Sequence, residues 1–173
     1  MLMNREGIFR KAIQENDRRI FRICRHFFGP GDEAHDAYQE ILLKIWLNLD
    51  TFRGEAQIKT WINRITVNVC LTFLAQAKKR SSILVPFSKT EYEENIAGQE
   101  EVHDDEEKKL RFFQTFMQQL SVQDKTLVSL YLEDLDKKEI AQTTGFSESN
   151  VRVRIHRIKK QIQLELEKKY GTR

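Results

Sequence analysis

The stretch EIAQTTGFSESNVRVRIHRIKK, residues 139–160, constrains the fold of this chain more than any other. A small residue, Ala141, is followed four positions later by Gly145, and Val151 comes six positions after that. Two helices that cross closely need a small side chain at the contact, and the turn between them needs a residue that tolerates positive φ. Ser147 can cap the second helix with its hydroxyl group. The spacing therefore predicts a helix-turn-helix.

The second helix of this pair has an apolar side and a basic side. Its inward stripe recurs at steps of four, three and four residues and consists of Val151, Ile155, Ile158 and Ile162. The segment RVRIHRIKK, residues 152–160, carries five cations and no acid. Arginine can bond guanine edges in the major groove and other cations can neutralise phosphates, so the pattern favours DNA binding over a basic solvated face. The predicted contacts are Ser149, Asn150, Arg152, Val153, Arg154, His156, Arg157 and Lys160.

Apolar residues in the first half of the chain also recur at helical spacing. One stripe consists of Ile20, Ile23, Cys24 and Phe27, and the helix-breaking GPGDE follows it at residues 29–33. The next consists of Tyr38, Ile41, Leu42, Ile45, Trp46 and Leu49. The third consists of Ile58, Trp61, Ile62, Ile65, Val69 and Phe73, beside a polar band of Thr60, Arg64, Asn68 and Thr72. No segment alternates strictly enough to predict a sheet, so the predicted fold class is all-α.

The second half of the chain carries capping signals for its helices. SVQD at 121–124 and DKKE at 136–139 each place a capping oxygen three residues before an acid. They predict helices that begin near Val122 and Lys137. A preceding helix is marked by Leu110, Phe113, Phe116, Met117 and Leu120. With the helix that follows Ser147, this half is predicted to contain four helices.

An acidic block separates the two halves. Residues 91–107 contain nine acids and no lysine or arginine. A polar block between two periodic segments is typical of a linker. We therefore predict one small helical domain at 5–85, an acidic flexible linker at 86–106 and a second small helical domain at 107–170.

Other classes of protein are disfavoured by what the sequence lacks. Cys24 and Cys70 lie inside apolar patterns without metal-ligand spacing, which predicts reduced core thiols. No apolar run approaches a membrane span and no signal peptide is recognisable, so we expect a cytoplasmic protein without direct membrane insertion. A metal-dependent nuclease built on DDEE, residues 104–107, is disfavoured because paired metals need carboxylates on a rigid scaffold. We expect no metal and no cofactor.

Two parts of the sequence resemble the sigma-70 family, specifically its extracytoplasmic-function (ECF) group. Residues 34–80 are similar to its region 2, and residues 132–162 are similar to its region 4. The region 2 motifs are Asp36, Gln39 and Glu40, then FRGE at 52–55, then TWINRITVN at 60–68. The resemblance covers nearly the whole chain, and the acidic linker falls where the family has a variable connector.

The resemblance implies a transcription initiation factor, not an enzyme, that recruits core RNA polymerase to promoters. In the family, region 2 docks on the clamp helices of the polymerase and melts the −10 element, whereas region 4 docks on the flap and reads the −35 element. The implied polymerase contacts are Asp36, Gln39 and Glu40. The implied contacts with single-stranded −10 DNA are Phe52, Arg53, Arg64, Asn68, Lys78, Lys79 and Arg80. The helix-turn-helix would contact duplex −35 DNA, and an anti-sigma factor is a further expected partner.

Three positions depart from the family pattern. Thr72 and Ala75 stand where Asp and Arg usually follow Asn68, which removes an expected ion pair or phosphate contact. Val153 stands where a small hydroxyl residue is common, so the base preference there is expected to differ.

Several alternatives stay open at the level of sequence. Trp61 either packs in the core or stacks on a base, and His156 is either an idle surface side chain or a DNA contact. The acidic linker is either an ordinary tether or a carboxylate chain that acts in the polymerase cleft. The face of Asp36 is either a docking surface or a solvated helix side. The whole chain could also be a conventional operator-binding regulator that never contacts polymerase.

Overall fold

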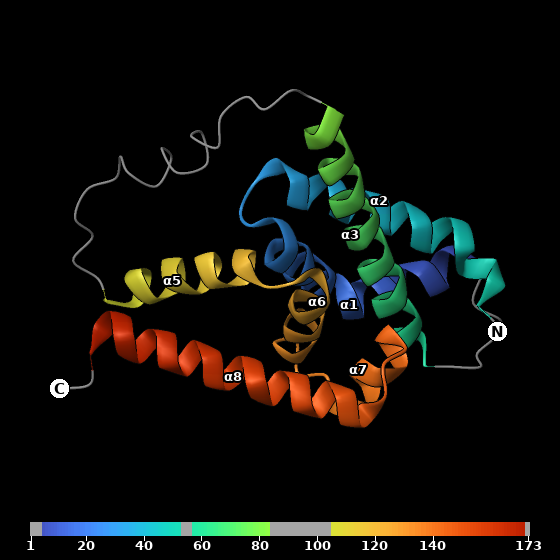
Figure 1. Cartoon of the computed structure of the whole chain (residues 1–173). Coiled ribbons are helices and arrows are strands. Elements are labelled where there is room, and N and C mark those ends of the chain that lie inside the picture. Colours follow the sequence, from blue (N-terminus) through green and yellow to red (C-terminus); the bar gives the residue numbers. More distant parts are fainter. Residues whose placement is uncertain (1–4, 53–56, 84–104, 172–173) are drawn as a thin grey trace.

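The computed structural model describes residues 5–52, 57–83 and 105–171, and the regular structure in these residues is helical (Figure 1). The predicted all-α fold class is confirmed. Its elements are α1 (Arg5–Phe28), α2 (Asp32–Asn48), a short 3-10 helix (Leu49–Thr51), α3 (Ile58–Ile83), α5 (Asp105–Gln119), α6 (Val122–Tyr131), α7 (Lys137–Thr144) and α8 (Glu148–Tyr170). We refer to α1–α3 as the N-terminal lobe and to α5–α8 as the C-terminal lobe. Among the described residues, no helix has the length and apolar character needed to cross a bilayer.

The N-terminal lobe is a three-helix unit in which α1, α2 and α3 pack against one another. The predicted stripe of α1 is confirmed, since Ile20, Ile23, Cys24 and Phe27 are all buried. Gly29, at a φ of 77°, follows α1 where the sequence predicted a break. This left-handed conformation favours glycine because it has no Cβ to clash. The chain can therefore reverse and place α2 beside α1.

The buried side of α3 differs from the predicted stripe. Ile62 and Val69 are buried as expected, but Trp61, Ile65 and Phe73 are only half-buried. Thr60, predicted to lie in an outward polar band, is 5% exposed. The reason is tertiary: α3 is covered by α1 and α2 on one side and also contacts α7 of the other lobe. A helix with neighbours on two sides buries a wider face than one apolar stripe.

The C-terminal lobe begins its helices at the predicted caps. The Ser121 hydroxyl accepts a hydrogen bond from the Asp124 amide at 3.1 Å. Asp136 and Glu139 form the predicted capping box at the start of α7. Gly145 ends α7 at a φ of 79°, and the Ser147 hydroxyl caps α8 by accepting from the Asn150 amide. The helix-turn-helix is therefore confirmed in its local geometry.

The helix marked by apolar residues at the start of this lobe is confirmed as α5, but one of those residues is not buried. Leu110 is 55% exposed, and Phe112 is buried instead. The ring of Phe112 contacts Tyr170 at the far end of α8, with the ring centroids 6.0 Å apart. Tyr170 Oη also donates a hydrogen bond to the Lys108 carbonyl at 3.0 Å. The return of α8 to the start of α5 thus selects which apolar side chain of α5 is buried (Figure 1).

The two lobes lie against each other. One cluster of buried apolar residues spans both lobes and includes Ile20 and Ile62 from the first and Leu130 and Ile140 from the second. A smaller cluster of Phe116, Met117, Val128 and Ile158 lies within the C-terminal lobe. Between α1 and the turn after α6, Arg22 donates Nε and Nη2 to the Glu133 carboxylate at 2.5–2.9 Å. The Glu133 side chain is only 1% exposed. A bidentate pair with a buried carboxylate fixes the orientation of the two partners, because both N–H···O bonds must align.

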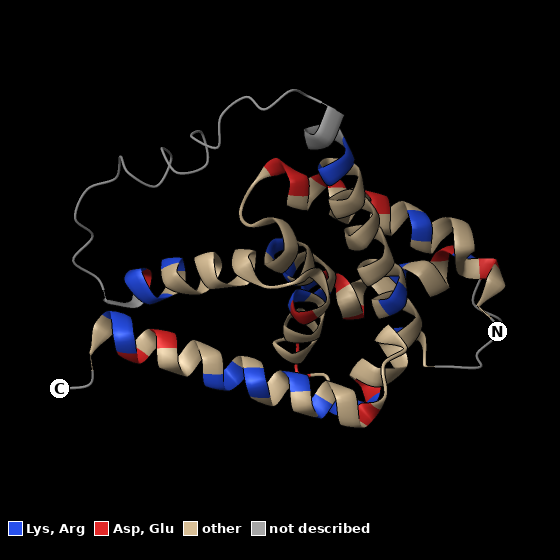
Figure 2. Cartoon of the chain, viewed as in Figure 1, with Lys and Arg blue, Asp and Glu red and all other residues tan. Residues whose placement is uncertain are grey.

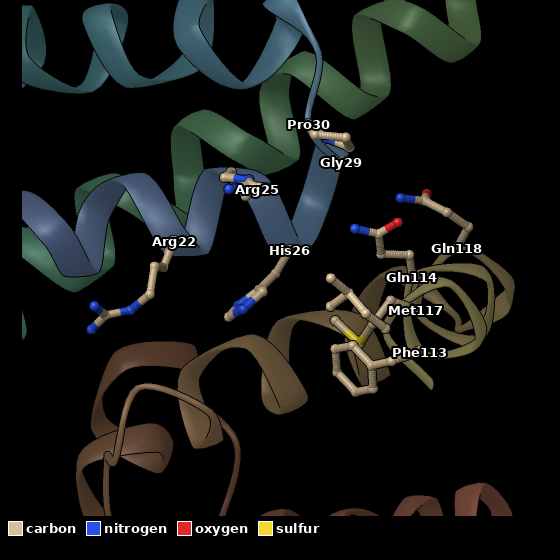
Figure 3. A pocket seen from close by; sticks show the side chains of 10 residues that line it. Arg22, Arg25, His26, Gly29, Pro30, Phe113, Gln114, Met117 and Gln118 are labelled. Carbon is tan, nitrogen blue, oxygen red and sulfur yellow. The ribbon is translucent and has the colours of Figure 1, made fainter. Parts of the chain in front are cut away.

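The joint between the lobes is packed at α6 and open at α5. A pocket of about 300 Å³ lies between α1 and α5. Figure 3 shows Arg22, Arg25 and His26 on one side of it and Phe113 and Met117 on the other. The predicted linker, residues 86–106, lies outside the described residues except for Asp105 and Glu106, which belong to α5.

His26, at this joint, makes the stability of the chain depend on pH. Burial lowers its pKa below the ordinary value of 6.5; Glu133 opposes this shift, and Arg22 and Arg25 add to it. The unfolded chain takes up the proton near pH 6.5, whereas the folded chain resists protonation until lower pH. Stability should therefore fall as the pH drops from 6.5 toward the lowered pKa.

We expect the melting temperature to fall more between pH 7.5 and 5.5 in the unchanged chain than in His26→Gln. An equal fall in both would contradict the assignment.

Candidate functional site

The outward face of α8 carries the predicted DNA contacts. Val151, Ile155 and Ile158 are buried and fix which side of the helix faces the lobe. The opposite and flanking sides expose Ser149, Asn150, Arg152, Val153, His156, Arg157, Lys159 and Lys160. Figure 2 shows the basic residues spread along this helix. The helix-turn-helix thus presents a polar, basic surface to solvent, as the spacing predicted.

Arg154 is held differently from its neighbours. Its Nε donates to Asp124 Oδ1 at 2.8 Å, its Nη1 donates to Gln123 Oε1 at 2.9 Å, and the guanidinium lies over the Phe146 ring. Only 18% of the Arg154 side chain is exposed. Its contact with DNA stays a prediction, and these contacts give it a structural role that the sequence pattern did not reveal.

Asp124 is the acceptor at the centre of this arrangement. Besides Arg154, it accepts hydrogen bonds from the Ser121 hydroxyl and from Arg157 Nη2, the latter at 3.1 Å. Burial acts to raise the pKa of Asp124, but the hydrogen bonds from Arg154 and Ser121 outweigh it and the pKa is lowered. Arg157 remains 64% exposed while it is held by this carboxylate. Asp124 therefore holds two predicted DNA-contact residues, Arg154 and Arg157, and of these Arg157 stays exposed.

A second exposed surface runs along α2. Asp36 and Gln39 are exposed, and Glu40 is half-buried and pairs with Lys44 at 3.6 Å. Leu43 and Leu47 are 50% and 57% exposed. Because residues at spacings of three, four, seven and eleven share one helix side, Asp36, Glu40, Leu43 and Leu47 form a single stripe. We call these four residues, together with Gln39, the α2 face. The sequence analysis did not single out either leucine. Both could have been noticed, because they are apolar residues that fall outside the stripe predicted to be buried.

The predicted −10 contacts are distributed over three places. Trp61, Asn68 and Thr72 of α3 line a groove of about 680 Å³ together with Glu40 and Lys44 of α2. The Phe52 ring packs on Trp61 with centroids 5.4 Å apart, so Trp61 combines a packing contact with a position on the groove wall. Lys78 and Lys79 are exposed on the last turns of α3, to which Arg80 also belongs. Arg53 lies outside the described residues.

Arg64 is engaged by the other lobe. Its Nε and Nη2 donate to the Gln142 carbonyl of α7 at 2.9 and 2.7 Å. Beside it, Lys59 Nζ lies 2.9 Å from Glu139 Oε1. The sequence could not predict these contacts, because the residues are about 80 positions apart.

The thiols and acids contain no metal site in the described part of the chain. No group of three His, Cys, Asp or Glu side chains that could hold an ion occurs there. Cys24 and Cys70 are free and buried, as predicted. A hydrogen bond with Cys24, together with burial, raises the pKa of the Cys70 thiol well above its ordinary value. Most of the acidic cluster at 104–107 lies outside the residues whose side chains are described.

Comparison with known families gives a match in each lobe. The family described as "Sigma-70 region 2" matches residues 12–80. The family described as "Sigma-70, region 4" matches residues 113–162. The matched ranges fall on α1–α3 and on α5–α8 respectively.

Curated relatives are also named as RNA polymerase sigma factors. The RNA polymerase sigma factor SigV of Bacillus subtilis is 28% identical over 158 residues, which is 91% of this chain and 90% of that protein. The ECF RNA polymerase sigma factor SigW of the same organism is 24% identical and covers 86% of this chain and 83% of that protein. The match to the ECF sigma factor SigG of Mycobacterium tuberculosis, 33% identical, covers 44% of this chain and only 20% of that protein.

Solved structures share the fold. CnrH, in complex with the cytosolic domain of CnrY, has a TM-score of 0.69 at 17% identity, over 96% of this chain and 91% of that one. The sigma factor RpoE of Bartonella quintana, in complex with the anti-sigma factor NepR, has a TM-score of 0.61 at 20% identity, over 89% of this chain and 95% of that one.

Proposed function

Because the chain belongs to the sigma-70 family, in its ECF group, we propose that it is a transcription initiation factor that directs core RNA polymerase to specific promoters. Such a factor binds and positions other molecules and is not an enzyme. The observation that carries the proposal is the order of two lobes in one chain: a region 2 match on α1–α3 precedes a capped helix-turn-helix with a basic outward face. A single operator-binding module does not need the first lobe.

The proposed −35 contacts lie on α8. Arg152 and Arg157 have side chains that are 65% and 64% exposed, so both can reach DNA without breaking the lobe. Arginine pairs with guanine edges or neutralises phosphates, and the rest of the basic run adds sequence-independent attraction. Ser149, Asn150, His156 and Lys160 complete the proposed surface.

Replacing Arg152 and Arg157 together with alanine should weaken promoter binding by the assembled polymerase and flatten its salt dependence. Each lost phosphate contact reduces the slope of log K against log salt by about 0.9. Binding measured from 50 to 200 mM salt, together with run-off transcription, checks this result. Lys168→Ala, at the far end of the same helix, is the control and should leave both unchanged. An unaltered slope in the double variant would count against these contacts.

One proposed −10 contact, Arg64, is held by the other lobe. The Arg64 guanidinium that donates to the Gln142 carbonyl cannot hold a DNA phosphate with the same two N–H groups. The groove between α2 and α3, with Asn68 and Trp61 in its wall, is open to an unstacked base. We therefore place the contact of these Arg64 N–H groups with −10 DNA in a form of the chain in which α7 has left α3. Docking of the two lobes at separate polymerase sites supplies the free energy for that separation.

The α2 face is the proposed docking surface for core polymerase. Protein interfaces typically combine an apolar centre with a polar rim. On the α2 face the two exposed leucines provide the apolar centre, and the acids and the amide provide the polar rim. We also propose an anti-sigma partner, since the sigma factor RpoE, which shares the fold, was solved in complex with the anti-sigma factor NepR, and CnrH was solved in complex with the cytosolic domain of CnrY. The cytoplasm, where the polymerase acts, is the proposed location.

Promoter-directed transcription tests the proposal. Purified core RNA polymerase is given a pool of genomic fragments with and without this protein, and new discrete start sites are mapped. Their aligned upstream sequences would show two conserved elements. The proposal is wrong if no new starts appear, core polymerase is not bound, and the protein alone binds duplex DNA tightly, because those results describe an operator-binding regulator.

A further inference from the structure

The first half of α8 exposes one large apolar side chain. Among residues 148–160, all of which the structure describes, Val153 is 67% exposed, whereas Val151, Ile155 and Ile158 are between 0% and 4% exposed. Val153 is therefore outside the core, although its residue type is typical of the core.

Val153 lies in the middle of the outward face. Successive residues of an α-helix turn by about 100°, which places position 153 opposite the centre of the buried trio 151, 155 and 158. Its neighbours along this face are Ser149 one turn earlier and His156, Arg157 and Lys160 on the following turns. Arg152, by contrast, lies toward one edge of the face and pairs with Glu148 at 3.5 Å. The side chain best placed to enter a groove is thus apolar and is surrounded by polar and basic groups.

The chemistry of valine limits what it can recognise. It has no hydrogen-bond donor or acceptor, so it cannot read the polar edge of any base. The apolar group that B-DNA displays in its major groove is the C5 methyl of thymine. A β-branched side chain in a helix also keeps one strongly preferred rotamer, so its two methyl groups are presented in a fixed direction.

We propose that Val153 is a specificity-determining residue that selects a thymine in the −35 element by contact with its methyl group. This inference rests on the proposed function, because it needs α8 to lie in the major groove. The flanking polar and basic residues then read or neutralise the positions on either side. Serine, a hydroxyl residue without a methyl group, would lack that apolar contact at this site.

Deoxyuridine substitution tests the contact, because deoxyuridine pairs as thymine does but lacks the methyl group. In promoters found by the transcription experiment, each thymine of the upstream element, on either strand, is replaced in turn. Binding is measured with the assembled polymerase. We expect one position at which loss of the methyl weakens binding about fourfold, as for one methyl-sized group removed from water. With Val153→Ala the same promoter pair should differ by less than about 1.5-fold.

Two matched variants separate the possible outcomes. Leu164→Ala removes an exposed apolar side chain, 47% exposed, from the same helix and should keep the fourfold difference. Arg157→Ala should weaken binding to both DNAs and keep their ratio. If Arg157→Ala weakens binding but no methyl effect depends on residue 153, the inference is overturned and the proposed function stands. If no promoter is found at all, both fail. Alanine is a better helix former than valine, so Val153→Ala will fold.

Discussion

Replacing Leu43 and Leu47 together with serine is expected to weaken the binding of core RNA polymerase by roughly 30-fold. The two side chains are 50% and 57% exposed in the free chain, so about half of each remains to be buried by a partner. Full burial of a leucine contributes about 1.5–3 kcal/mol, and half of that for two residues is roughly 2 kcal/mol. Titration of labelled core polymerase with each form of the chain measures the change.

The fold provides a control for this experiment. Leu164→Ser removes a leucine of similar exposure, 47%, that lies on α8 and not on the α2 face. It should change polymerase binding little. Since Leu43 and Leu47 face away from the buried Ile41 and Ile45, the double variant should melt close to the unchanged chain. A folded double variant that binds polymerase as tightly as the unchanged chain would rule out the apolar part of the α2 face as a docking surface.

Replacing Asp124 with alanine is expected to destabilise the C-terminal lobe by about 3 kcal/mol. The carboxylate is 11% exposed and accepts hydrogen bonds from Ser121, Arg154 and Arg157. Its removal leaves the Arg154 guanidinium, only 18% exposed, without its anionic partner, and breaking a buried pair on one side typically costs 3–5 kcal/mol. Urea unfolding measures the loss.

An exposed ion pair serves as the comparison for Asp124. Asp50 pairs with Arg5 at 3.0 Å, but its side chain is 65% exposed, so Asp50→Ala should cost less than about 1 kcal/mol. Equal losses in the two variants would show that the Asp124 network adds nothing beyond a surface pair. In Asp124→Ala the Arg157 side chain should also lose its fixed orientation. Promoter binding should therefore weaken even at urea concentrations below the unfolding midpoint of this variant.

The pH dependence of this network has a definite sign. Because the pKa of Asp124 is lowered in the folded chain, its contribution is fully present above the pKa of the unfolded chain, near 3.9. The contribution is lost as the pH falls through the lowered folded value. Asp124→Ala should therefore be less stable than the unchanged chain at pH 7, and the gap should close in strong acid.

Local signals in the sequence determined where most helices begin and end. Ser121, Asp136 and Ser147 cap helices because their side-chain oxygens satisfy amides two or three residues away, and no distant residue is needed. The buried stripes of α1 and α8 were predictable for the same reason: a helix with one covered side buries residues at a fixed period. The outward residues of α8 followed from that stripe.

Contacts between residues far apart in the sequence decided which other side chains are buried and which partners the arginines have. Thr60 is buried on a helix that packs against α1, α2 and α7, and Phe112 is buried in place of Leu110 where Tyr170 reaches back to α5. The sequence shows that Arg154 and Arg64 are cations, but their partners follow from the tertiary structure. Arg154 donates to Asp124, and Arg64 donates to the Gln142 carbonyl. The physical reason is that periodicity and capping act within one or two helical turns, whereas the partner of an arginine depends on which elements the whole fold brings together.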